Sequence, residues 1–141
     1  MERNEDYYSA ACRHLAAARL LEEHQRLLTA DHLNGFAAEC FLKHAMVQSG
    51  NSIPKKHIDQ LRSDMASCID AARFPDLLAV WSVCRASFAE WRASDRYIGT
   101  RELESALLRC EAGVALWERR RDCVRRMAEL LGTAGEEDHV G

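Results

Sequence analysis

The most suggestive spacing for chemistry lies in the segment 31–43, where charged residues interrupt small apolar ones. Glu39 and Lys43 are four residues apart, so on a helix the carboxylate lies beside the ammonium in the favourable orientation. A charged pair among Ala, Cys and Phe must be paired or solvated. It either points into a cleft and binds a ligand, or it forms a partly exposed ion pair. We favour the ion pair and retain Glu39 and Lys43 as candidate ligand-binding residues.

No spacing in the chain completes a metal or nucleotide site. Cys40 and His44 are also four residues apart, which supplies half of a metal site, but no further ligands follow at a matching spacing. The six cysteines form no Cys-x-x-Cys pair. Phosphate-binding glycine loops, a P-loop lysine and a serine nucleophile elbow are lacking as well. We therefore expect neither a metal nor a cofactor.

A basic stripe marks the late part of the chain and is the strongest candidate for contact with RNA. Guanidinium groups bind phosphates, and an aromatic ring stacks on unpaired bases. The alternative is a solvated helix face, which the net charge of -3 favours. His57 is a further candidate for ligand binding, since a neutral imidazole can cap, pack or exchange a proton. The stripe comprises Arg119, Arg120, Arg125 and Arg126, and Arg96 with Tyr97 adds a further guanidinium and a ring.

The composition predicts one helical domain that positions these residues. The 141 residues are 48% hydrophobic and 29% charged, the ordinary profile of a globular domain. Only two prolines interrupt long stretches rich in Ala, Leu, Arg and Glu, which are strong helix formers. Alternating strand patterns are absent. The fold class expected is therefore all-α.

Apolar positions repeat with helical spacing in five stretches, so we predict an antiparallel bundle of about five helices. In the last stretch the apolar positions alternate in steps of four and three and form a seam along one side of the helix. Arg121 is the only charged residue at these positions, and we expect the seam to leave the core at Arg121. Thr29 or Asp31 is expected to cap the second helix. The predicted helices span 6–28, 29–48, a segment from Pro54 to about Ile69, a segment from Pro75 to about Trp91, and 100–131.

The same pattern sets the domain boundaries. Residues 1–131 are predicted to form a single domain, and residues 132–141 an acidic, flexible tail. Four of the first six residues are charged, and no apolar run approaches the roughly 18 residues of a membrane span. We therefore expect a cytoplasmic protein with reduced cysteines and no membrane partner.

The segment 35–43, Gly-Phe-Ala-Ala-Glu-Cys-Phe-Leu-Lys, follows a helix of the Ala-Ala-Arg-Leu-Leu type at 17–21. It resembles the second helix of the HEPN-domain family. The segment 56–61, then Trp91 with Arg96 and Tyr97, and the long last helix follow in the order seen in small bacterial HEPN proteins. The resemblance covers about residues 7–131.

The resemblance implies an up-and-down four-helix core with a long C-terminal helix that often dimerises. Some HEPN proteins are metal-independent ribonucleases in toxin-antitoxin and defence systems, and others are non-catalytic modules paired with nucleotidyltransferases. The ribonucleases carry an Arg, four to six intervening residues and a His near the start of the long helix. Here Arg92, Arg96 and Arg101 lack a His at that distance. The usual catalytic motif is therefore missing from its expected place.

Two Arg and His pairs elsewhere match the bare spacing. Arg19 and His24 are five positions apart on one helix, which does not bring them together. Arg26 and His32 flank a corner between two helices and converge more easily, so they are the first pair to test.

Three functions therefore remain open. The first is a HEPN-like binding or regulatory module, not an enzyme, that works as a homodimer or with a nucleotidyltransferase or a toxin-antitoxin or defence component. The second is a metal-independent HEPN endoribonuclease that uses a displaced Arg and His. The third is a structural subunit for protein-protein interaction. RNA or a nucleotide is a possible ligand in the first two cases.

Overall fold

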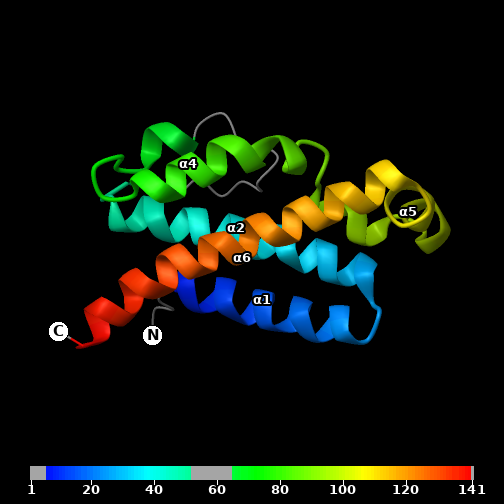
Figure 1. Cartoon of the computed structure of the whole chain (residues 1–141), viewed down its shortest axis with the longest axis horizontal. Helices are drawn as coiled ribbons and strands as arrows, with labels where there is room; N and C mark the ends of the chain where they lie inside the picture. Colours follow the sequence, from blue (N-terminus) through cyan, green and yellow to red (C-terminus); the bar gives the residue numbers. More distant parts are fainter. Residues whose placement is uncertain (1–5, 52–64, 141) are drawn as a thin grey trace.

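The computed structural model describes residues 6–51 and 65–140, except for the side chains of residues 65–66, 96–97 and 133–140. This part of the chain contains helices and no strand, which confirms the predicted all-α bundle (Figure 1). The α-helices are α1 (Tyr7–Glu23), α2 (Leu27–Gln48), α4 (Pro75–Cys84), α5 (Thr100–Leu107) and α6 (Glu111–Val140). Three short 3-10 helices join them: η1 (Met65–Cys68), η2 (Arg85–Phe88) and η3 (Ala93–Tyr97).

Helix α1 begins at a capped terminus and ends in a tight turn. The Asp6 carboxylate accepts a hydrogen bond from the Ser9 amide at 2.9 Å, which satisfies one of the free N–H groups of the first turn. The helix stops at Glu23, earlier than predicted, and Gln25 then adopts a left-handed backbone conformation with φ 59°. This turn reverses the chain, so that α1 and α2 pack as an antiparallel pair.

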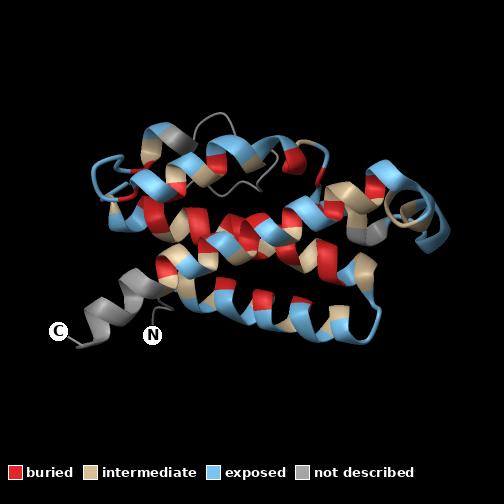
Figure 2. Cartoon of the chain, in the orientation of Figure 1, coloured by how far each residue is buried: buried red, intermediate tan, exposed pale blue. Residues whose placement is uncertain are grey.

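Helix α2 is the centre of the bundle. It lies between α1 and α4 and behind α6 in Figure 1, and it is buried on more than one face, as Figure 2 shows. Its N-cap is Arg26, so the prediction that Thr29 or Asp31 caps the helix is wrong. Both residues lie inside the helix, and Asp31 is 5% exposed. The buried residues of α2 include the polar side chains Asp31, Asn34 and Glu39.

Helix α4 starts at Pro75, as predicted, because proline fits the first helical turn. It continues into η2, where Phe88 packs against Trp81 with ring centroids 5.9 Å apart. Trp81, Phe88 and Trp91 are each 1% exposed and form much of the core, whereas Val83 is 80% exposed and lies outside it.

The predicted single helix 100–131 is wrong, because the structure divides this stretch into α5 and α6. Leu108, Arg109 and Cys110 form the break. Gly113, in the first turn of α6, packs directly on the end of α5: a Cβ atom there would lie 2.3 Å from the Ala106 carbonyl oxygen. The two helices therefore meet at an angle, and α5 stands at one end of the bundle (Figure 1).

Several predicted features lie at the margins of the described residues. Most of the helix predicted from Pro54, including Ile58 and Leu61, lies outside them, while Ile69 is buried after η1. Helix α6 extends to Val140 and so enters the predicted tail, whose flexibility stays a prediction. None of the described helices has the length and apolar character needed to cross a membrane.

Candidate functional site

A buried ion pair links α2 to α6 at the end of the bundle nearest α5. The Arg120 Nη1 atom donates to Asp31 Oδ2 at 2.9 Å, and Arg120 Nε donates to the Ser87 carbonyl oxygen at 2.6 Å. Asp31 and Arg120 are each 5% exposed. One guanidinium therefore joins α2, η2 and α6 in an environment that excludes water.

The burial of Arg120 corrects two predictions. It was expected in the RNA-binding stripe, but its guanidinium points into the protein and is not available to a phosphate. The charged member of the α6 seam is Arg120, not Arg121, because the buried positions Trp117, Arg120 and Val124 follow one another in steps of three and four. Arg121 is half-buried and lies over the Trp117 ring at 5.1 Å.

Burial raises the pKa of Asp31 above its ordinary value of 3.8. The neighbouring Arg120 lowers this pKa through its charge and its hydrogen bond, and the carboxylate of Asp95 raises it. Desolvation outweighs the attraction of the guanidinium, as is common for buried pairs.

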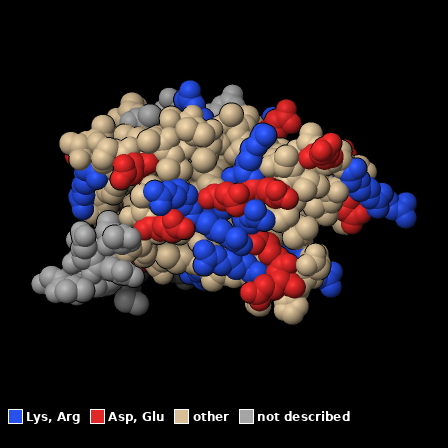
Figure 3. All heavy atoms as spheres, in the orientation of Figure 1, with Lys and Arg blue, Asp and Glu red and all other residues tan. Residues whose placement is uncertain are grey.

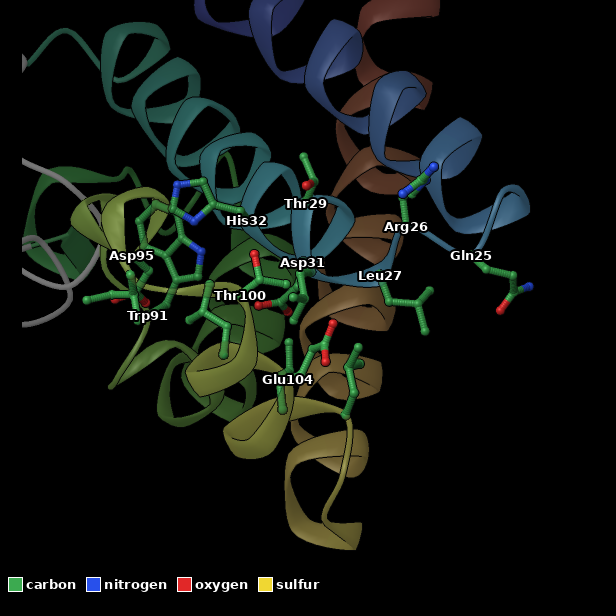
Figure 4. Close-up of a pocket in the computed structure, with 15 residues that line it drawn as sticks. Gln25, Arg26, Leu27, Thr29, Asp31, His32, Trp91, Asp95, Thr100 and Glu104 are labelled. Atoms are coloured by element: carbon green, nitrogen blue, oxygen red, sulfur yellow. The ribbon is translucent and has the colours of Figure 1, made fainter.

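A cavity of about 460 Å³ opens beside this ion pair, between the start of α2, η3 and α5 (Figure 4). Asp31, Asp95 and Glu104 bring three carboxylates to its lining. Thr100, Leu103, Glu104 and Leu107 face it from α5, where their spacing places them on one side of the helix. The remaining lining residues are Gln25, Arg26, Leu27, Leu28, Thr29, His32, Trp91, Ile98 and Leu108.

The candidate pair Arg26 and His32 lines this cavity but does not converge. His32 packs against the rings of Phe36 and Trp91, with centroids 5.0 and 5.3 Å away. Arg26 is exposed, and in Figure 4 its guanidinium points away from His32. The two side chains thus stand at separate parts of the lining.

Trp91 is held in place by a close approach to α2. A Cβ atom at position 35 would lie 2.0 Å from the Trp91 ring, so only glycine at this position leaves room for the indole. Phe36 meets the same ring edge to face at 5.2 Å. The Gly35-Phe36 segment therefore supports one wall of the cavity.

Glu39 and Lys43 form the predicted ion pair, with Lys43 Nζ 3.2 Å from Glu39 Oε1. It is more buried than expected: the side chains are 6% and 13% exposed. The ammonium also lies 5.7 Å from the centre of the Tyr7 ring. Neither residue lines the cavity.

The other ligand-binding candidates cannot be placed at a site. His57 lies outside the described residues, and although Arg96 and Tyr97 belong to η3, their side chains are not described.

Two of the remaining arginines of the stripe are neutralised within the chain. Arg125 Nη2 lies 2.6 Å from Glu22 Oε2, and Arg126 Nη1 lies 3.1 Å from Glu129 Oε2. Arg119 is exposed. Figure 3 shows positive and negative side chains interleaved across this face, without a uniform positive surface.

Sequence reasoning missed Asp95 and Glu104 as site residues. The only available signal was on α5, where Glu104 shares a face with the apolar positions Leu103 and Leu107. Among the side chains that the structure describes, no group of three or more His, Cys, Asp and Glu is arranged to hold a metal ion.

Comparison of the chain with protein-family models, with curated proteins and with solved structures finds no match.

Removing one member of the buried pair should be costly. Asp31→Leu leaves the Arg120 guanidinium buried without its carboxylate, and we expect the free energy of unfolding to fall by about 3–5 kcal/mol. The double variant Asp31→Leu/Arg120→Met should recover most of this loss, because it removes both charges. Denaturant unfolding of the single and double variants measures the energetic coupling between Asp31 and Arg120.

The exposed pair Arg126 and Glu129 is the matched control. The double variant Arg126→Met/Glu129→Leu should change the free energy of unfolding by less than about 1 kcal/mol, as for other surface ion pairs. Equal effects of Asp31→Leu and of the control would show that Arg120 does not need Asp31 as a buried partner.

The raised pKa of Asp31 makes the free energy of unfolding depend on pH in a defined direction. The folded state binds the Asp31 carboxyl proton more tightly than the unfolded state does. The resulting contribution to the free energy of unfolding is therefore fully present below pH 3.8 and is lost as the pH rises through the pKa of the folded state. We expect a titration of the Asp31 carboxyl carbon by NMR to have its midpoint above 3.8. A midpoint below that value would show that attraction to Arg120 outweighs desolvation.

Proposed function

We propose that this chain is a HEPN-like binding or regulatory module without ribonuclease activity, which works as a homodimer or with a partner protein. A nucleotidyltransferase or a toxin-antitoxin or defence component is the kind of partner that the resemblance implies. The all-α bundle supports the resemblance at the level of fold class. The specific support comes from the cavity.

The observation that carries the proposal is the separation of Arg26 from His32. Metal-independent cleavage of RNA requires an acid or base within hydrogen-bond reach of the reacting group, and the guanidinium must lie at the same phosphate. His32 packs against two aromatic rings and its Nε2 atom is buried. Arg26 points elsewhere (Figure 4). This arrangement suits a binding cavity better than a catalytic centre.

The charge distribution supports the same conclusion. Asp31 and Glu104 in the cavity lining are paired with Arg120 and Arg109, and Asp95 offsets the charge of Arg26, so the described lining carries no excess of positive charge for the phosphates of RNA. Arg120 is buried, and Arg125 and Arg126 are paired with acidic residues. The predicted RNA-contact residues therefore offer less positive charge than the sequence suggests.

A metal-independent ribonuclease is the second candidate. One observation favours it, namely that Arg26 and His32 line the same cavity although they come from different turns of α2. Since Arg26 is exposed at the N-cap, its long side chain has other rotamers available.

A cleavage assay separates the two candidates. Purified protein is incubated with mixed structured RNAs in EDTA, and we expect no cleavage by the wild type, because the Arg26 guanidinium points away from His32 and the His32 ring is packed against Phe36 and Trp91. The double variant Arg26→Ala/His32→Ala should behave as the wild type.

The pair Arg19→Ala/His24→Ala is the matched control, since it has nearly the same spacing on exposed positions of α1 and its turn. Wild-type cleavage that falls by about a hundredfold or more in Arg26→Ala/His32→Ala, and not in the control, would establish the ribonuclease instead.

A further inference from the structure

We propose that Cys84 and Cys123 are a redox modification site, at which a hydroperoxide converts the two thiols into a reversible disulfide that joins α4 to α6. Cys84 is the last residue of α4, and Cys123 lies within α6. All six cysteines of the chain are among the described residues, and all are free thiols. Neither member of the pair lines the cavity, so this site does not rest on the proposed function.

The two thiols lie side by side at the packed interface of α4 and α6. Cys123 is 3% exposed and belongs to the apolar core, and Cys84 packs against this core from α4. The Cys123 S–H group donates a hydrogen bond to the sulfur of Cys84. The side chains therefore already point toward each other, which is the arrangement that a disulfide requires.

A chain of polar contacts holds α4 and α6 in register beside the thiols. The Ser87 hydroxyl donates to the Cys84 carbonyl oxygen at 2.6 Å. Arg120 Nε in turn donates to the Ser87 carbonyl oxygen, also at 2.6 Å. Ser87 follows Cys84 by three residues, and Arg120 precedes Cys123 by three, so these bonds lie about one helical turn from the sulfurs. The contact between the thiols is thus supported by the buried guanidinium that joins the two segments.

The thiols differ in acidity, and this difference gives each a separate role. The hydrogen bond from Cys123 lowers the pKa of Cys84, although burial acts in the opposite direction. The hydrogen bond to Cys84 raises the pKa of Cys123, and burial raises it further. Since the thiolate is the nucleophile, Cys84 is the sulfur that attacks the oxidant. Cys123 is the thiol that then displaces the product.

The exposure of the two residues agrees with these roles. Cys84 is half-buried, and its neighbours Val83 and Arg85 are exposed, Val83 to 80%. Hydrogen peroxide, which is only slightly larger than water, can reach this sulfur from the surface. Cys123 is covered by the core. An accessible thiol of lowered pKa beside a second cysteine is the usual arrangement of a redox-sensitive site.

The oxidation takes place in two steps. The Cys84 thiolate attacks one oxygen of hydrogen peroxide, the O–O bond breaks, and the leaving hydroxide is protonated to water, so that Cys84 becomes a sulfenic acid. The Cys123 sulfur then attacks the sulfenic sulfur: the S–S bond forms, and the hydroxyl group leaves with the Cys123 proton as water. The pair has lost two electrons and two protons, and the peroxide has been reduced to two waters. A dithiol reductant restores the thiols by thiol-disulfide exchange.

The test treats the full chain with hydrogen peroxide at low protein concentration, blocks the remaining thiols under denaturing conditions and maps disulfides by mass spectrometry after trypsin digestion. Each cysteine lies in a different tryptic peptide, so the link is assigned without ambiguity. We expect the peptides 74–85 and 122–125 to be joined in the main product, and a dithiol reductant to separate them.

Variants test the role of each sulfur. Cys123→Ala should form no internal link and should accumulate the sulfenic acid at Cys84, which dimedone traps. Cys84→Ser should slow the oxidation of Cys123 by about tenfold or more, because the attacking thiolate is gone. Cys40→Ala is the matched control: Cys40 is also half-buried, but burial raises its pKa to about 11. This variant should form the link as the wild type does.

The wild-type digest decides the proposal even if a variant fails to fold. Absence of the link between Cys84 and Cys123 after peroxide treatment would overturn it. An equal yield of links that involve Cys12 or Cys110, which are exposed, would overturn it as well, because the oxidation would then be unselective. In folded Cys123→Ala, dimedone labelling of Cys40 equal to that of Cys84 would contradict the assignment of Cys84 as the attacking sulfur.

Discussion

The buried ion pair between Asp31 and Arg120 is the constraint on which the rest of the structure depends. A guanidinium that is removed from water must have its donors satisfied, and here they reach Asp31 on α2 and the Ser87 carbonyl in η2. These contacts determine the register of α6 against the two elements that it covers. A second link runs nearby, since Arg125 binds Glu22 of α1 and Glu22 accepts a hydrogen bond from Asn34 at 3.3 Å. Polar contacts therefore join helices α1, α2 and α6.

The cavity follows from the same arrangement. Asp31 belongs both to the ion pair and to the cavity lining, so the residue that connects α2 to α6 also contributes charge to the surface facing α5. The break before α6 turns α5 away from the bundle axis, and its apolar face then meets the start of α2 across an open space. Gly113 permits the break, and Gly35 permits the position of Trp91 on the opposite wall. The site thus depends on two glycines and one buried charge, not on a catalytic motif.

Local pattern was sufficient to predict the fold class and several helices. Pro75 marks the start of α4, and the helices predicted over 6–28 and 29–48 include α1 and most of α2. The break between α5 and α6 was missed because the apolar spacing continues through it, and no pattern of side chains records the close backbone contact that Gly113 permits there. The sequence pattern also placed Arg121, and not Arg120, in the apolar seam of the last helix. The partner that makes Arg120 compatible with burial is Asp31, 89 residues away in sequence. The Glu39 and Lys43 pair, whose partners are four residues apart, was predicted correctly as an ion pair.

The exchange of the Arg120 Nε–H proton with solvent, measured by NMR on the whole 141-residue chain, tests the burial of Arg120 most directly. Arg119 is the internal reference, since it is the adjacent residue and is exposed. If Arg120 donates to Ser87 inside the bundle, its Nε–H exchanges far more slowly than that of Arg119, and Asp31→Leu accelerates the exchange. Equal exchange rates for Arg119 and Arg120 would show that Arg120 lies in solvent, and would contradict both the proposed anchor of the bundle and the cavity built beside it.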